Sequence, residues 1–356
     1  MGTGGKRVVV AMSGGVDSSV AAAILKKEGY EVIGVTMRLW SEGDGDSPAP
    51  HRRCCSVEEV EDARRVCQVL DIPFYVVNLE TQFRTHVVDY FCREYLRGRT
   101  PNPCLACNRW IKFDSLLNKA MALGAGYLAT GHYARIERYD EGYRLLKALD
   151  ASKDQSYVLY ALRQKEMEHL LFPMGLYRKS EARKMAQGLG LPVWDKEESQ
   201  ETCFIFNGDY RHFLAERSSH QPGDIVDADG KVRGRHSGIA FYTVGQRRGL
   251  GVVSREPLYV LSIDRVSNRV VVGSDEQLLR SELVASEVSF VSGEAPKEPV
   301  EVTAKIRYKS PEARAMLYPE GERVRLVFEE PQRAITPGQA MVFYDGDVVL
   351  GGGIIE

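Results

Sequence analysis

Apolar positions in the first 130 residues form blocks of two kinds, short continuous runs and longer stretches with a spacing of three and four. The apolar run 8–12 predicts a short buried strand, and the Ala- and Leu-rich stretch 16–28, closed by Gly29, predicts a helix. Strands that alternate with helices are typical of an α/β fold with a doubly wound parallel sheet, whose ligands bind at the carboxyl ends of the strands. Further strands are expected over 31–40, 74–79 and 127–130, and further helices over 56–70, 81–96 and 113–123.

The pattern changes beyond about residue 210. Short runs of alternating apolar and polar residues are separated there by turn sequences at 227–230, 318–322 and 344–348. This pattern predicts antiparallel β structure, with a boundary near residue 280. We therefore expect a doubly wound catalytic domain over 1–211, a small, mostly β middle domain over 212–280 and a C-terminal antiparallel β-barrel over 281–356.

The first predicted strand runs into the sequence Ser-Gly-Gly-Val-Asp-Ser at 13–18. Gly14 and Gly15 carry no side chains, so their backbone N–H groups can approach a pyrophosphate, and the next helix adds the positive end of its dipole. Asp17 repels a bare phosphate but suits a magnesium ion that rides on one. No Walker pattern follows, and no lysine is expected to reach the phosphates. The loop resembles the PP-loop of ATP pyrophosphatases, which cleave ATP between its α and β phosphates.

Composition narrows the class of protein. With 356 residues, of which 44% are hydrophobic and 27% charged, the chain is that of an ordinary globular protein with two or three domains. A formal net charge of −2 excludes a polycation, so contact with nucleic acid would need a local basic patch. No apolar run approaches the roughly 18 residues that span a membrane, and none suits a signal peptide. We expect a cytoplasmic protein with no membrane partner.

The seven cysteines favour thiol or metal chemistry over a disulfide scaffold in such a chain. Cys67 and Cys92 fall on apolar helix faces and are expected in the core. Cys54 and Cys55 end a mobile connection over 41–53, which we expect them to help dock.

The other three cysteines are placed for chemistry. Cys104 and Cys107 form a C-x-x-C in a proline-containing loop between helices, and Cys203 lies far along the chain. Their spacing fits a zinc site completed by His132 or His212, a redox dithiol, or an iron–sulfur cluster with three cysteine ligands and one open position. Zinc is the least favoured of the three.

Six sequence blocks carry a family resemblance. Together they resemble the tRNA-specific 2-thiouridylases, and the resemblance covers essentially the whole chain. It implies an ATP-dependent sulfurtransferase that converts the wobble uridine, position 34, of tRNAs for Lys, Glu and Gln into 2-thiouridine, with AMP and pyrophosphate as products. The blocks are SGGVDS at 13–18, RTPNPCLACNRWIKF at 99–113, TGHYARI at 130–136, KDQSYVLY at 153–160, SQETCFI at 199–205 and YTVGQRRGLG at 242–251.

The resemblance also implies roles for individual residues. Cys107 matches the family's nucleophile and Cys203 its persulfide carrier. Many relatives have Asp at the position of Cys104, so this chain adds a thiol there. The positions matching the nucleotide site are Ala11, Met12, Ser13, Gly14, Gly15, Val16, Asp17, Ser18, Met37 and Gly131. Those matching tRNA contacts are Asn102, Pro103 and Cys104 at the target base, with Lys153, Asp154, Gln155, Arg307 and Tyr308 elsewhere.

The implied reaction needs ATP and magnesium. Transfer of AMP to the uracil C2 oxygen turns a poor leaving group into a good one, and sulfur then attacks C2. A persulfide on Cys203 would supply that sulfur, released by a transient disulfide with Cys107. The alternative is a 4Fe-4S cluster held by Cys104, Cys107 and Cys203. The implied partners are tRNA and a sulfur donor such as a cysteine desulfurase or a persulfide relay protein, with the enzyme a monomer.

Two more distant hypotheses stay open on the sequence. One is an ATP-using ligase that amidates a small molecule, which leaves both cysteine motifs and the β domains without a role. The other is a tRNA-binding or metal-storage protein with a vestigial nucleotide site. A tRNA-binding enzyme would need a basic patch, for which we expect Arg233, Arg235, His236, Gln246, Arg247, Arg248, Lys305, Arg307 and Lys309.

Overall fold

The computed structural model describes residues 6–40, 57–140, 142–197, 202–205 and 208–356. Five strands form the central sheet of its first part in the order β3-β2-β1-β4-β7, and every neighbouring pair is parallel. The predicted parallel sheet is thereby confirmed. Its strands are β1 (Arg7–Ala11), β2 (Glu31–Arg38), β3 (Phe74–Asn78), β4 (Tyr127–Ala129) and β7 (Leu170–Leu171).

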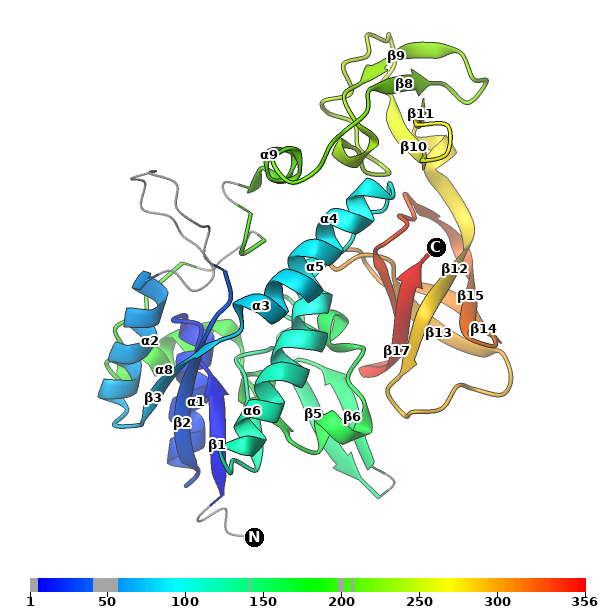
Figure 1. Cartoon of the computed structure of the whole chain (residues 1–356). Helices are drawn as coiled ribbons and strands as arrows, with labels where there is room; N and C mark the ends of the chain where they lie inside the picture. Colours follow the sequence, from blue (N-terminus) through cyan, green and yellow to red (C-terminus); the bar gives the residue numbers. More distant parts are fainter. Residues whose placement is uncertain (1–5, 41–56, 141, 198–201, 206–207) are drawn as a thin grey trace.

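Helices cover both faces of this sheet, as Figure 1 shows. Successive side chains of a strand point to opposite faces, so Val8 and Val10 of β1 join one hydrophobic cluster and Val9 joins another. The first cluster is covered by α1 (Val16–Lys27), α2 (Val57–Val69) and α8 (Lys179–Gly188). The second is covered by α3 (Glu80–Phe83), η1 (Arg84–Val88), α4 (Asp89–Leu96), α5 (Pro103–Ala106), η2 (Cys107–Leu116) and α6 (Leu117–Ala122).

Two of these segments, η1 and η2, are π-helices. The helix predicted over 81–96 is therefore present, but it is interrupted by the π-turns of η1. The loop predicted around the C-x-x-C is wrong, because the chain becomes helical at Pro103. Proline suits the first helical position, and the Asn102 side chain accepts the N–H of Cys104 at 3.0 Å, which caps the helix.

A β-hairpin that we did not predict follows β4. Its strands β5 (Ala134–Tyr139) and β6 (Gly142–Lys147) pair with each other, and β6 also pairs with the last strand of the chain, β17 (Val348–Ile355). The hairpin therefore extends the sheet of the C-terminal part. Short helices follow it: η3 (Ser156–Leu159), α7 (Gln164–Met167) and η4 (Pro173–Leu176).

The middle part begins with α9 (Tyr210–Ala215) and holds a sheet in the order β10-β11-β8-β9. The expectation of purely antiparallel strands is wrong here, because β8 and β11 pair in parallel. Its remaining elements are β8 (Gly223–Val226), β9 (Val232–His236), η6 (Ile239–Phe241), β10 (Tyr259–Asp264) and β11 (Arg269–Gly273).

The C-terminal part is the predicted antiparallel barrel. Six strands follow the order β12-β15-β14-β13-β16-β17, and β12 pairs with β17, which closes the barrel. The predicted turn at 344–348 joins β16 to β17, with Gly346 at a φ of 56°. The elements are η7 (Glu276–Leu278), β12 (Leu279–Phe290), β13 (Val300–Lys305), β14 (Ala313–Glu320), β15 (Arg323–Arg333), β16 (Ala340–Asp345) and β17.

The two cysteines predicted to lie in the core are found there. Cys67 is buried and Cys92 packs against the second cluster, as expected for core residues. Cys54, Cys55 and Ser56 lie outside the described residues. None of the described helices combines the length and the apolar character that crossing a bilayer requires.

Candidate active site

The loop between β1 and α1 is folded back on itself by its two serines. Ser18 Oγ accepts the backbone N–H of Ser13 at 3.2 Å and donates to the carbonyl of Gly15 at 3.3 Å. Gly14 has a φ of 70°, and a Cβ there would lie 2.4 Å from the backbone oxygen of Glu59 in α2. A side chain would therefore both strain the turn and collide with α2, so the close approach requires glycine.

Asp17, in the first turn of α1, is held by two donors from distant segments. Lys179 Nζ lies 2.6 and 2.7 Å from its two carboxylate oxygens, and the Tyr133 hydroxyl donates to it at 2.8 Å. Lys179 is only 8% exposed, at the N-terminus of α8, where the backbone N–H of Lys179 donates to Asp150 at 2.9 Å. A lysine therefore lies beside this loop, although it comes from a distant helix and not from a Walker pattern. A carboxylate at the loop mouth fits a magnesium ion, which takes one or two carboxylates plus phosphate oxygens.

Lys196 is a second lysine at the loop. Its Nζ donates to the carbonyl of Gly14 at 3.0 Å and to Asp62 at 2.7 Å. Neither lysine stood out in the sequence, although Lys179 carries one signal. It sits at the first position of a helix, where the helix dipole disfavours a cation, so a compensating anion was to be expected.

Gly131 closes the other side of the loop. It follows β4, and a Cβ on it would lie 2.7 Å from the backbone nitrogen of Ser18. Met37, another residue predicted at the nucleotide site, lies on β2, beside β1 in the sheet. The structure therefore gathers the predicted nucleotide-binding residues at the carboxyl ends of neighbouring strands.

Cys107 and Cys203 are both half-buried and pack against the same hydrophobic cluster. Cys107 begins η2. Cys203 is followed by Phe204, whose ring lies edge-on against Phe83 of α3 at 5.7 Å and Phe91 of α4 at 5.4 Å. This aromatic packing brings the remote segment to α3 and α4, and α3 in turn contacts η2, the helix that begins at Cys107.

The described part of the chain contains no set of ligands for the zinc or iron–sulfur site that the sequence suggested. No three or more His, Cys, Asp or Glu side chains gather there closely enough to hold a metal ion. Cys104, Cys107 and Cys203 as placed do not fit a three-cysteine cluster, and neither His132 nor His212 completes a zinc site.

The half-buried segment 153–155, predicted to contact tRNA, is held by hydrogen bonds to other parts of the chain. Asp154 accepts the N–H of Ala148 at 3.0 Å and the Ser156 hydroxyl at 2.7 Å, and the Gln155 side chain accepts the N–H of Tyr133 at 2.9 Å. Tyr308, from the barrel, donates to the Asp154 carbonyl at 3.3 Å. These contacts brace Tyr133, which in turn holds Asp17.

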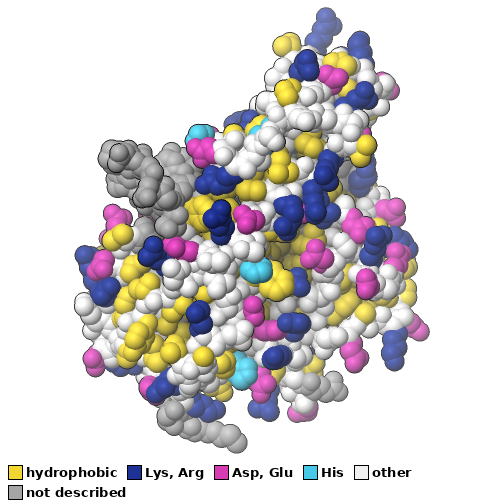
Figure 2. Space-filling model, in the orientation of Figure 1, with side chains coloured by type: hydrophobic (Ala, Val, Ile, Leu, Met, Phe, Trp, Pro, Cys, Tyr) yellow, Lys and Arg dark blue, Asp and Glu magenta, His cyan; other side chains and the backbone are white. Residues whose placement is uncertain are grey.

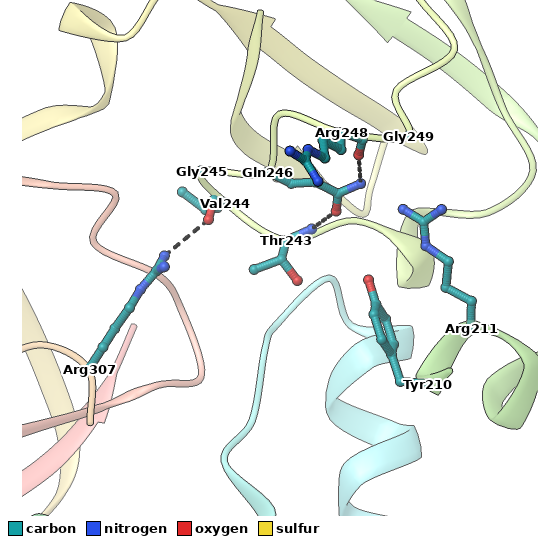
Figure 3. Close-up of a pocket in the computed structure, with 9 residues that line it drawn as sticks. All are labelled: Tyr210, Arg211, Thr243, Val244, Gly245, Gln246, Arg248, Gly249 and Arg307. Carbon is teal, nitrogen blue, oxygen red and sulfur yellow. Dashed lines mark hydrogen bonds between the residues drawn. The ribbon is translucent and has the colours of Figure 1, made fainter. Parts of the chain in front are cut away.

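A pocket of about 520 Å³ lies between the middle part and the barrel (Figure 3). The described residues that line it include three arginines and no Asp or Glu. Arg307 donates to the backbone oxygens of Val244 at 3.1 Å and Ala334 at 2.9 Å, so it joins the middle part to the barrel. Burial and the charge of Arg333 lower the pKa of Arg307. The lining residues are Tyr210, Arg211, Thr243, Val244, Gly245, Gln246, Arg248, Gly249 and Arg307.

The predicted basic patch is only partly assembled. Arg248 and Arg307 line the pocket together with Arg211, which sequence reasoning missed. Arg233 pairs with Asp227 at 2.8 Å. His236 is 3% exposed, so it is wrong as a surface residue. Figure 2 shows Lys and Arg side chains gathered on the face where α4 meets the middle part.

A doubly wound sheet with a PP-loop at the end of its first strand defines an α/β enzyme that uses ATP. Comparison with known families supports this class. Residues 6–207 match the tRNA methyl transferase HUP domain, 211–274 the tRNA methyl transferase PRC-barrel domain and 280–355 the aminomethyltransferase beta-barrel domain.

Curated relatives match over almost their full length. The tRNA-specific 2-thiouridylase MnmA of Acetivibrio thermocellus is 50% identical over 99% of both chains, and that of Clostridium perfringens is 49% identical over 99% of this chain and 98% of its own. The chain therefore belongs to the tRNA-specific 2-thiouridylase family, as its sequence blocks indicated. Among solved structures, the U34-tRNA thiolase NcsA from Methanococcus maripaludis is 17% identical with a TM-score of 0.36, over 60% of this chain and 66% of its own.

Proposed function

We propose that this enzyme replaces the C2 oxygen of the wobble uridine by sulfur in tRNAs for Lys, Glu and Gln. The observation that carries the proposal is the combination of the PP-loop at 13–18 with Cys107 and Cys203 at one hydrophobic cluster, in a chain about half identical to named 2-thiouridylases. Since its substrate is tRNA, we place the reaction in the cytoplasm.

The PP-loop would bind the phosphates of ATP through its backbone N–H groups and the N-terminus of α1. Asp17 would hold a magnesium ion together with phosphate oxygens, and that ion would neutralise charge on the departing pyrophosphate. Lys179, which contacts both Asp17 oxygens, is placed to shift from the carboxylate to a phosphate when the nucleotide enters.

Activation of the uridine precedes sulfur transfer. The uracil O2 forms a bond to the α-phosphorus, and pyrophosphate leaves with the electron pair of the broken P–O bond. The terminal sulfur of a Cys203 persulfide then bonds to C2. As Cys107 bonds to the inner sulfur of Cys203, the S–S bond of the persulfide breaks. AMP leaves with the electron pair of the broken C2–O bond.

This route requires a sulfur source and a reductant. A persulfide-carrying protein, such as a cysteine desulfurase or a relay protein, would load Cys203. A thiol reductant would reopen the disulfide between Cys107 and Cys203 after each turnover. Because the three cysteines as placed form no ligand set, we derive no step through a 4Fe-4S cluster.

The arginine-lined pocket and the face around it are suited to the tRNA backbone, because guanidinium groups bind phosphates in a bidentate manner. Asn102, Pro103 and Cys104 lie at the start of the helical segment that carries Cys107, which favours a contact with the target base. One enzyme monomer on one tRNA is the simplest assembly for this surface.

The proposal is tested with an unmodified transcript of a tRNA that has U34, a persulfide donor and ATP. Cys107→Ser and Cys203→Ser should each lower thiolation, measured by the shift of thiolated tRNA in a mercury-containing gel, by at least about a thousandfold. Binding of tRNA should stay within about threefold. Cys92→Ser is the matched control, because burial raises the pKa of the Cys92 thiol and keeps it unreactive. Substantial thiolation by either of the first two variants would overturn the assignment.

A further inference from the structure

Lys112 lies on the cysteine helix, the continuous helical segment of α5 and η2 that carries Cys104 and Cys107. It lies on the π-helix η2 five residues after Cys107, and in a π-helix the hydrogen bond from residue i to residue i−5 places such residues one turn apart. Its Nζ lies 3.3 Å from Nε2 of His132. His132 directly follows Gly131, the residue packed against Ser18 of the PP-loop.

His132 is fixed so that it can only accept from this lysine. It is 8% exposed, and burial together with the charge of Lys112 lowers its pKa well below the ordinary value, so the ring is neutral. An ammonium group only donates, so Nε2 accepts from Lys112 and the ring proton resides on Nδ1. Nδ1–H then donates to the Thr130 hydroxyl at 2.7 Å.

Aromatic packing locks the imidazole in this orientation. The rings of Phe113 and Phe172 both lie 5.8 Å from the His132 ring. These ring contacts and the bond to Thr130 orient the imidazole, and its Nε2 in turn orients the lysine side chain. An ammonium group has three N–H donors, and the contact with His132 uses one of them. The remaining donors can be offered to an anion.

We propose that Lys112 is a catalytic residue that donates to a non-bridging oxygen of the α-phosphate while AMP is transferred to the uridine. His132 is the positioning residue that aims it. This role rests on the proposed function. It adds a residue that contacts one defined atom of the substrate, a non-bridging oxygen of the α-phosphate. In this step the uracil O2 bonds to the α-phosphorus, the bond to the bridging oxygen breaks, pyrophosphate takes the electron pair, and the N3 proton passes to water.

The proposal explains why a lysine is placed here as well as at Asp17. The contact of Lys179 with Asp17 lies at the start of α1, where the magnesium ion and the outgoing pyrophosphate are expected. Lys112 approaches from the cysteine helix, the side from which the uridine and the sulfur must arrive. A donor there can hydrogen-bond to the α-phosphate in both steps, when AMP is transferred to the uridine and when AMP leaves it.

The experiment uses the full-length enzyme, tRNA with U34 and ATP labelled in the α-phosphate. Lys112→Met should lower the rate of AMP transfer to tRNA by about 10² to 10³-fold, as for loss of one preorganised donor, with tRNA binding within about threefold. Lys112→Arg should retain part of the rate. Lys119→Met, an exposed lysine on the following helix α6, is the matched control and should behave as the wild type.

A second measurement separates contact from structure. The two diastereomers of ATP with sulfur at a non-bridging α-position should differ in rate for the wild type, and Lys112→Met or Lys112→Gln should reduce that ratio at least about fivefold. His132→Gln, whose amide oxygen can replace Nε2 as acceptor, should keep more activity than His132→Leu.

The outcomes are distinct. The role of Lys112 alone is overturned if the wild type is active and Lys112→Met transfers AMP at the same rate. It is also overturned if Lys112→Met is slower but keeps the wild-type ratio between the diastereomers. A wild type without preference between the diastereomers also overturns it. A wild type that transfers no AMP to tRNA overturns the proposed function itself.

Discussion

Asp17, in the first turn of α1, is the predicted magnesium-binding residue of the nucleotide loop. Its side chain is 31% exposed and that of its partner Lys179 is 11% exposed, so the pair lies at the edge of the interior, where charges interact strongly but remain partly solvated. The Tyr133 hydroxyl supplies a further hydrogen bond. The pair and this hydrogen bond therefore hold the carboxylate in one orientation at the loop before any metal arrives.

This arrangement predicts the effect of removing the lysine. Lys179→Met should lower the free energy of unfolding by about 1–3 kcal/mol without ATP, because the carboxylate loses its cation. Relief at the helix N-terminus offsets only about 0.3–1 kcal/mol of that loss. Urea denaturation measures the change, and Lys184→Met, an exposed lysine of the same helix, is the control. Equal losses in both variants would contradict the importance of the ion pair.

At the scale of elements, the start of the cysteine helix has the clearest local cause. Asn102 caps α5 by accepting the N–H of Cys104, and Pro103 occupies the first helical position. The cap thus fixes where the helical segment carrying Cys104 and Cys107 begins. A shift of this start would rotate both thiols about the helix axis.

Asn102→Ala should therefore lower the free energy of unfolding by about 0.5–2 kcal/mol, the usual cost of losing a cap, while Asn102→Asp should stay near the wild type because a carboxylate also accepts. Thermal or urea unfolding without tRNA measures this and leaves aside any contact of Asn102 with RNA. Asn118→Ala removes an exposed side-chain bond to Asp114 and should cost less. If the Asp variant lost as much as the Ala variant, capping would not be the reason.

The elements also differ in how far the sequence could predict them. The strand, loop and helix over 8–28 are specified by residues next to one another, so β1, the PP-loop and α1 could be read directly. The helix at Pro103 was missed because proline was taken as a sign of a loop, whereas its position after a capping residue starts a helix. The hairpin β5–β6 was missed because its outer partner, β17, comes about two hundred residues later.

The candidate site shows the same division. Gly14, Asp17 and the two cysteine motifs could be proposed from short patterns. The contact between Lys179 and Asp17 joins residues 162 positions apart, and that between Lys112 and His132 depends on a π-helix. No local sequence pattern predicts either contact, because each lysine reaches the site only when the chain is folded.

At the scale of the whole molecule, the barrel is tied to the segment that leads into the cysteine helix. The N–H of Thr100 donates to the Pro337 carbonyl at 2.8 Å, and the Gln339 side chain donates to the Thr100 carbonyl at 2.7 Å. Gly338 is needed there, because a Cβ would lie 2.9 Å from the Thr100 nitrogen. A tRNA held by the barrel and the middle part would thus be placed relative to Cys107 through backbone contacts rather than through a mobile link.

Arg307 could act in one of two ways: it could hold the middle part against the barrel, or it could bind a phosphate of the tRNA. Its guanidinium donates to carbonyls of the middle part and the barrel, so we expect Arg307→Lys to lose about 1–3 kcal/mol of stability and to weaken tRNA binding about three- to tenfold by loosening the two parts. The slope of log affinity against log salt should stay unchanged. A residue that neutralises a phosphate contributes about 0.7–0.9 to that slope, and Arg248→Met, at the exposed rim of the pocket, should remove this amount. A phosphate contact would give a different result. Arg307→Lys would keep the salt slope, Arg307→Met would lower it as much as Arg248→Met does, and neither Arg307 variant would lose stability. That result would support the predicted tRNA contact and contradict the role of Arg307 as a clamp.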